Sequence, residues 1–107
     1  MASIYSTRFI RALGATTGTY TVPAGKTAIV RSVQFVNGGG AAAQFTILSG
    51  NPANVYAFNG YVPPLASPNN NNNLFLDLRL VLTAGDILNV GIPASCYATV
   101  SGYLFTL

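Results

Sequence analysis

Side chains able to perform acid–base or metal chemistry are almost missing from this sequence. It has no histidine, a single cysteine, Cys96, and only two acidic residues, Asp77 and Asp86. Without histidine there is no imidazole to activate a serine nucleophile, and one cysteine alone cannot complete a zinc site. The two acids are separated in the chain, which argues against a hydrolytic carboxylate pair. We therefore expect a protein that is not an enzyme and has no cofactor, with weak calcium binding through amide and carbonyl oxygens left open.

Charged residues are also scarce. They make up 7% of the 107 residues, against about 25% in typical globular domains, whereas hydrophobic residues make up 50%. A small domain must still cover its surface, so we expect Ser, Thr, Asn and Gln to replace charges and part of the surface to be buried between subunits. The net charge of +3 comes from five cations scattered along the chain, which predicts no nucleic-acid partner: Arg8, Arg11, Lys26, Arg31 and Arg79.

Long apolar segments and a secretory leader are not found either. Gly, Pro or polar residues interrupt every apolar run before it reaches the roughly 20 residues of a membrane helix. The first thirteen residues lack the basic start and apolar block of a signal peptide. A lone cysteine excludes an internal disulfide, and we expect Cys96 to be a buried, inert thiol. These features predict no membrane partner and synthesis in a cytoplasm.

The chain instead shows short runs of β-branched, aromatic and aliphatic residues divided by turns, and no helical periodicity. Residues 74–83 are the clearest strand, since leucine occupies every second position from Leu74 to Leu82. Such alternation predicts one face in the core and the other, with Asp77 and Arg79, outside it and available for a cross-strand or subunit-contact ion pair. Residues 27–36 are apolar on both faces and should form a central strand. Further strands are expected over residues 4–13, 19–22, 44–48, 55–58, 61–62, 87–92 and 97–107.

Turn residues separate these strands. Pro23-Ala24-Gly25-Lys26 and Ala84-Gly85-Asp86 predict two similar tight turns with glycine at a left-handed position. Asn59-Gly60 predicts a two-residue hairpin between residues 55–58 and 61–62. Residues 65–73, which end in five asparagines, are expected to form an exposed loop. Together these elements predict one domain over residues 1–107, an all-β antiparallel sandwich of about eight strands, with the jelly roll as the favoured topology.

Two segments carry a family resemblance. One is residues 20–33, containing Tyr20-Thr21-Val22-Pro23-Ala24-Gly25-Lys26-Thr27, and the other is residues 80–90, containing Thr83-Ala84-Gly85-Asp86, followed by residues 98–104. This pairing resembles small β-sandwich proteins of tailed-bacteriophage virions, which include capsid decoration (cement) proteins, head fibres and tail-fibre or baseplate modules. The closing Ser101-Gly102-Tyr103-Leu104 is similar to the last strand of trimeric jelly rolls of the tumour-necrosis-factor and complement-C1q type.

The resemblance implies a structural virion protein, and a capsid decoration protein that stabilises the major capsid shell as a homo-oligomer, with a trimer favoured, is the first expectation. Residues 3–11 would reach a neighbouring molecule or form an ordinary edge strand. The alternative is a host-recognition module of a tail fibre or baseplate, with residues 37–43 and 67–73 as a recognition tip. A secreted jelly-roll ligand is a weaker option. The expected interface residues are Arg8, Arg11, Tyr56, Tyr61, Asp77, Arg79, Tyr97 and Tyr103.

Overall fold

The computed structural model describes residues 3–13, 17–64 and 72–106. They form eight β-strands, and the described ranges contain no helix. The strands are β1 (Ser3–Leu13), β2 (Thr17–Thr21), β3 (Lys26–Asn37), β4 (Ala43–Gly50), β5 (Ala53–Val62), β6 (Asn73–Leu82), β7 (Ile87–Gly91) and β8 (Cys96–Thr106).

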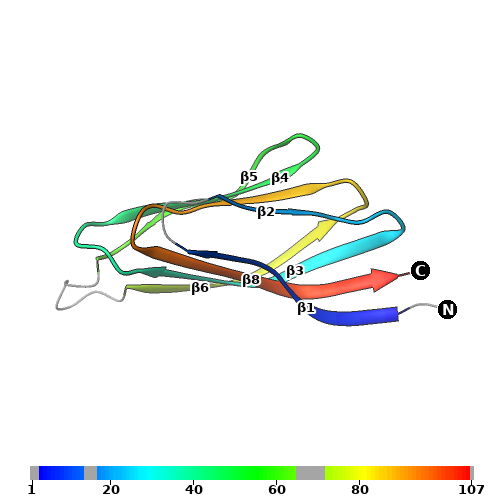
Figure 1. Ribbon diagram of the computed structural model, residues 1–107, viewed down its shortest axis with the longest axis horizontal. Helices are drawn as coiled ribbons and strands as arrows, with labels where there is room; N and C mark the ends of the chain where they lie inside the picture. Colours follow the sequence, from blue (N-terminus) through cyan, green and yellow to red (C-terminus); the bar gives the residue numbers. More distant parts are fainter. Residues whose placement is uncertain (1–2, 14–16, 65–71, 107) are drawn as a thin grey trace.

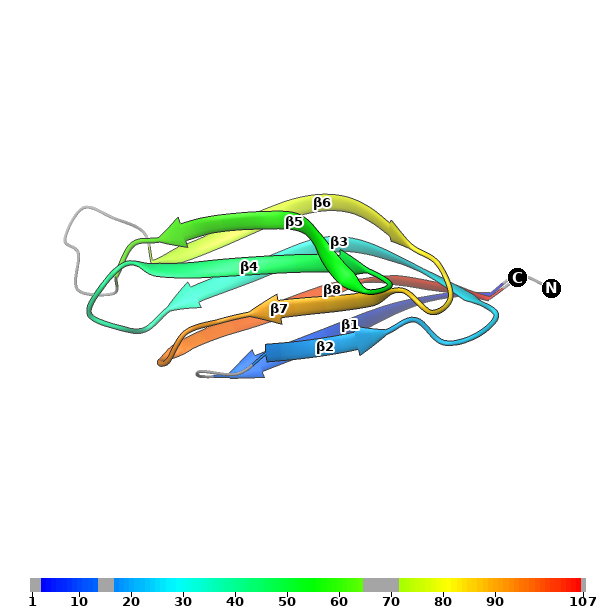
Figure 2. The ribbon, with the colours of Figure 1, turned by 90° about the horizontal axis from the view of Figure 1, so that it is seen from above.

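The strands form two four-stranded antiparallel sheets packed face to face (Figures 1 and 2). Sheet A has the order β1-β8-β3-β6, and sheet B has the order β2-β7-β4-β5. This interleaved order is that of a jelly roll: successive strands alternate between the sheets except β4 and β5, which are neighbours in sheet B. The expected all-β sandwich and its strand number are therefore confirmed. The sandwich is elongated, with extents of 51 × 24 × 18 Å.

The core lies between the sheets and is built from alternate residues of each strand. Phe35 of β3 stacks on Phe45 of β4 and Phe58 of β5, with ring centroids 4.5 Å and 5.6 Å apart, so aromatic contacts join sheet A to sheet B. The leucines of β6 that alternate from Leu74 to Leu80 pack against this core, as their spacing predicts. The buried apolar residues are Ile10, Ala12, Val22, Ala28, Val30, Val33, Phe35, Ala43, Phe45, Ile47, Val62, Leu82, Leu88, Val90, Ile92, Cys96, Ala98 and Val100.

Strand β3 is central in sheet A, between β8 and β6, as its two apolar faces predict. Its register shifts between Val30 and Ser32 against both neighbours, which marks a β-bulge at Arg31. A second shift separates Arg8 from Ile10 in β1. At each of these places the strand holds one extra residue, and the alternation of core-facing residues continues on either side of it.

The two Ala-Gly turns lie at the same end of the sandwich as the chain termini (Figure 1). In each turn the fourth residue donates its N–H to the first carbonyl: Lys26 to Pro23 at 3.2 Å, and Asp86 to Thr83 at 3.0 Å. Gly25 and Gly85 have φ of 76° and 88°, which a glycine adopts without strain. Val22 exchanges backbone hydrogen bonds with Asp86 and Gly85, so the two similar turns support one another.

The expected Asn59-Gly60 hairpin is wrong. Both residues lie inside β5, which runs unbroken to Val62 and pairs with β4 through Asn59↔Thr46 and Gly60↔Phe45. The glycine is needed for packing, because a Cβ at Gly60 would stand 2.8 Å from the Phe58 ring. The long partner strand β4 therefore overrides the local turn preference of Asn-Gly.

Candidate interaction surfaces

The outward face of sheet A gathers six of the eight expected interface residues. Core-facing Ala98 and Val100 fix the direction of β8, so Tyr97 and Tyr103 point outward, and core-facing Ile10 and Ala12 do the same for β1. The register then aligns Arg8, Ser101, Ser32 and Asp77 in one row across β1, β8, β3 and β6. We call this surface the arginine face; its charged members are Arg8, Arg11, Arg31, Asp77 and Arg79.

The ion pair on this face joins two strands. Arg31 at the bulge of β3 donates from Nη2 to Oδ1 of Asp77 on β6 at 3.4 Å. The sequence placed Asp77 in a cross-strand or subunit-contact pair, and the cross-strand form is the one observed. The Asp77 side chain is 82% exposed, so this pair adds little stability.

The four tyrosines expected at an interface are all exposed, but they divide between the sheets. Tyr97 and Tyr103 lie on the arginine face and are 48% and 44% exposed, whereas Tyr56 and Tyr61 lie on β5 of sheet B and are 59% and 68% exposed. The expected set is therefore not one surface. Three further exposed apolar residues were not in the expected interface set: Val55, Phe75 and Val81.

Strand β5 is an edge strand of unusual composition. It is ten residues long, lies at the end of sheet B and contains no charged residue and no proline. Val55, Tyr56 and Tyr61 are exposed on it, and we call these three residues the β5 patch. Of the other edge strands, β1 carries Arg8 and Arg11, β6 carries Asp77 and Arg79, and β2 has five residues. Charge, shortness and β-bulges protect edges from unwanted pairing. Strand β5 has neither charge nor shortness, and its register against β4 shifts between Ile47 and Leu48 and between Ser49 and Gly50.

Residues 3–11, expected to reach a neighbour or to form an edge strand, form the edge strand in this structure. They belong to β1, which pairs with β8 from Ser3↔Thr106 to Leu13↔Tyr97. Arg8 and Arg11 are exposed on it, so their side chains are available on the arginine face.

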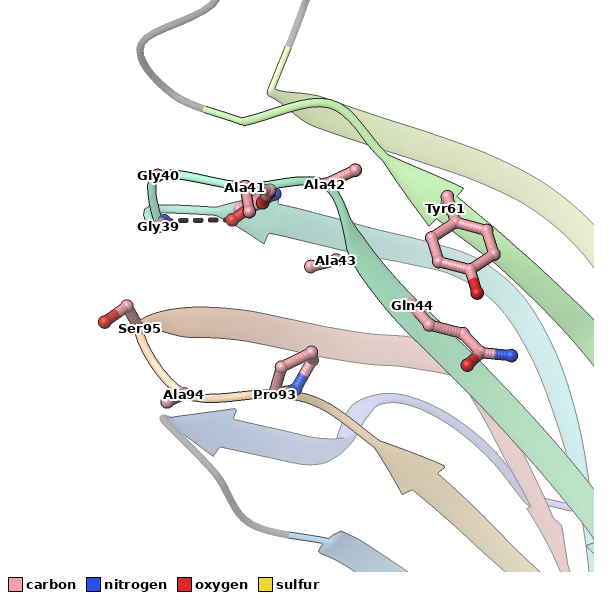
Figure 3. Close-up of a pocket in the computed structure, with 11 residues that line it drawn as sticks. Gly39, Gly40, Ala41, Ala42, Ala43, Gln44, Tyr61, Pro93, Ala94 and Ser95 are labelled. Atoms are coloured by element: carbon pink, nitrogen blue, oxygen red, sulfur yellow. Dashed lines mark hydrogen bonds between the residues drawn. The ribbon is translucent and has the colours of Figure 1, made fainter.

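A hollow of about 530 Å³ opens at the end of the sandwich opposite the termini (Figures 1 and 3). The β3–β4 loop forms one wall and the β7–β8 turn another, and Tyr61 and Gln44 stand at its side on β5 and β4. Its lining has no charged side chain, and Gly39, Gly40 and the alanines 41–43 leave it wide and shallow. Of the expected recognition tip, residues 37–43 contribute to this hollow; residues 67–71 lie outside the described residues.

Asn37 holds the wall of the hollow in place. Its side chain is 1% exposed and donates to Ala41 O at 2.8 Å and Val62 O at 3.0 Å, while Oδ1 accepts from Gly39 N at 2.9 Å. The Cys96 thiol also lies against Oδ1, at 3.5 Å. Burial raises the pKa of the Cys96 thiol, and a smaller opposing effect comes from a backbone hydrogen bond of Gly38. The expected buried thiol is confirmed.

Within the described ranges no three acidic, cysteine or histidine side chains gather into a possible metal site. The same part of the chain contains no helix able to cross a membrane.

No protein-family model and no curated protein sequence matches this chain. Among solved structures it resembles the Drosophila NLP-core, described for pentamer formation and histone binding, with a TM-score of 0.57, 8% identity and coverage of 94% of this chain and 96% of that one. A family 35 carbohydrate-binding module from an environmental isolate matches at 0.46, with 13% identity and coverage of 86% and 65%. The VP2 subviral particle of infectious bursal disease virus matches at 0.45, with 12% identity and coverage of 98% and 32%. The first of these likenesses shows a shared fold.

Proposed function

We propose that this chain is a structural protein of a tailed-bacteriophage virion, a capsid decoration protein that associates with copies of itself and binds the major capsid shell. The observation that carries the proposal is the uncharged edge strand β5 with its exposed patch. A long, apolar, uncharged edge promotes association unless another molecule covers it. A subunit contact on β5 would supply that cover.

Charge distribution favours a second copy of this chain as the molecule on β5. None of the four strands of sheet B, β2, β4, β5 and β7, contains a charged residue. Hydroxyl and amide groups take their place on the surface, as in the Thr19–Asn89 pair at 2.9 Å and the Gln44–Asn59 pair at 2.7 Å. Identical copies that each carry +3 repel least when they meet through a surface without charge.

In this proposal the mechanism is adhesive. Each copy buries apolar and aromatic surface against its neighbours, and many weak contacts repeated by symmetry add up through avidity. Bridging neighbouring capsomers then makes rupture of the shell more costly. A trimer is the favoured assembly, following the sequence resemblance.

Light scattering at micromolar concentration tests self-association. We expect an oligomer for the natural chain and a monomer for Tyr56→Lys, because a lysine in the β5 patch would bury an unpaired charge in the contact between copies. Ser6→Lys adds the same charge at an exposed position of β1 in sheet A, and this variant should stay oligomeric. A natural chain that is monomeric throughout would contradict this part of the proposal.

Position on the particle tests the virion role. Cryo-electron microscopy of intact particles that contain this chain should show it at threefold or quasi-threefold positions of the capsid. Density at the tail would overturn the decoration role in favour of the alternative below, and absence from the particle would overturn both.

The second candidate function is host recognition by a tail-fibre or baseplate module. The hollow beside Tyr61 favours this function. Its lining has no charged side chain and combines an exposed aromatic ring with amide groups, which suits a neutral sugar. A glycan array with the natural chain, Tyr61→Ala and Tyr56→Ala tests it. Glycan binding lost in Tyr61→Ala and kept in Tyr56→Ala would support recognition through the hollow.

A further inference from the structure

The fold concentrates the charge of the chain on one surface. Four of its five cations and one of its two acids lie on the arginine face, which therefore carries a net +3, equal to that of the whole sequence. The two remaining charges, Lys26 and Asp86, lie at the end that holds the Ala-Gly turns. A surface with a net positive charge of this size attracts a partner with a negatively charged surface.

Three of the four arginines on this face lie on the edge strands of sheet A. Arg8 and Arg11 lie on β1 and Arg79 on β6, three strand spacings or about 14 Å apart. On the strands between them, the hydroxyls of Ser32 and Ser101 lie 3.2 Å apart. No carboxylate within the described ranges lies at ion-pair distance from these three arginines, so they can meet external acceptors.

Exposed apolar groups surround this polar centre. Tyr97 and Tyr103 on β8, Phe75 and Val81 on β6 are 44–70% exposed. Aromatic side chains and arginine together are the residues enriched in protein–protein interfaces. We propose that the arginine face is the docking surface for an acidic surface of another protein; this rests on the proposed function, in which that protein belongs to the capsid shell.

The arrangement fits a nucleic acid less well. Asp77 stands next to Arg79's position on the edge strand β6 and would repel a phosphate there. Tyr97 and Tyr103 are six residues apart on one strand, about 20 Å, which is too far for stacking successive bases. The arginines are spread over the three strands β1, β3 and β6, and guanidinium groups spaced in this way suit scattered carboxylates.

Binding to immobilised poly-L-glutamate, with a twenty-nucleotide oligo-dT as the nucleic-acid probe, tests this proposal. We expect poly-L-glutamate to bind and to be released as sodium chloride rises from about 50 to 300 mM. Arg8→Gln and Arg79→Gln should each weaken binding several-fold, and the double variant about tenfold or more. Asp77→Asn should strengthen it, because it removes the repelling carboxylate and releases Arg31.

Lys26→Gln is the matched control, since it has the same net charge as Arg8→Gln but changes a cation outside the face. It should alter binding less than twofold. An equal loss in Lys26→Gln, weaker binding by Asp77→Asn, or tighter binding to oligo-dT than to poly-L-glutamate would overturn the proposal. Light scattering on the same variants separates the two proposals: a persistent oligomer that ignores poly-L-glutamate contradicts this inference alone, and a monomer that binds it contradicts self-association alone.

Discussion

Asn37 shows how one buried amide can organise a whole end of the sandwich. Its donors and acceptor reach the β3–β4 loop and the end of β5, and its own carbonyl accepts from Asn72 Nδ2 at 3.0 Å. Replacing it removes the partner of several backbone groups at once. Groups of this kind cost about 1–3 kcal/mol each when they stay buried and unpaired.

Asn37→Ala should therefore lower the free energy of unfolding by about 3 kcal/mol, or roughly 10–20 °C in Tm for a domain of this size. Thermal denaturation followed by circular dichroism measures the shift. Asn54→Ala changes the same residue type at an exposed position in β5 and should stay within about 0.5 kcal/mol. Equal effects of the two variants would show that the Asn37 hydrogen bonds do not stabilise the fold.

The partly buried Tyr20 and the buried Cys96 contribute to the pH dependence of stability at the alkaline side. Burial raises the pKa of Tyr20, whose ring packs on Phe9, and the pKa of Cys96 is raised by the same cause. A raised pKa means that the folded chain holds its proton longer than the unfolded chain. This contribution to stability is fully present below the ordinary thiol pKa of 9.0 and is lost as the pH rises through the folded-state values.

We expect the free energy of unfolding from urea titrations to fall as the pH rises above the ordinary thiol pKa of 9.0. Tyr20→Phe keeps the ring against Phe9 and removes the hydroxyl, so its stability should fall less over the same range. An identical pH profile for the natural chain and Tyr20→Phe would assign the alkaline loss to other groups.

At the scale of single elements, β8 depends on a glycine at the bulge of sheet A. Gly102 lies opposite Val30, and a Cβ there would collide with the backbone carbonyl of Ile29 and reach Arg31 N at 3.0 Å. Backbone cannot move aside as a flexible side chain can, so the central strands would have to separate.

Gly102→Ala should destabilise the fold by at least about 2 kcal/mol in urea denaturation. Gly40→Ala is the matched substitution, because nothing lies within 4 Å of its Cβ position, and it should change stability by less than about 0.5 kcal/mol. Tolerance of alanine at Gly102 would mean that the bulge relaxes far more easily than its geometry suggests.

Strands were predictable from the sequence where alternation and turn residues agreed. The leucine alternation of β6 and the Ala-Gly turns identified both element and orientation, because these signals are local. The Asn59-Gly60 signal misled because β4 supplies a partner along all of β5, which no local pattern reveals. The bulges at Arg31 and after Arg8 depend in the same way on register against neighbouring strands.

Surface residues were predictable as individuals but not as surfaces. Outward direction followed from strand alternation, and the same argument could have identified Phe75, which shares its face with Asp77 and Arg79. Which surface each residue joins depends on strand order. Cations that look scattered in the sequence meet on sheet A because the jelly roll brings β1, β3 and β6 into one sheet, and the same topology leaves β5 without charge.

For the whole molecule, this division of charge predicts opposite salt responses at its two surfaces. Contacts between copies through sheet B involve no charged strand residue, so screening by salt should weaken them little. Salt also reduces the repulsion between chains that each carry a net charge of +3. Sedimentation velocity between about 50 and 500 mM sodium chloride should show self-association unchanged or strengthened, while binding of poly-L-glutamate to the arginine face declines. Dissociation of the oligomer with rising salt would instead place the arginines within the contact between copies, and β5 would then need another partner.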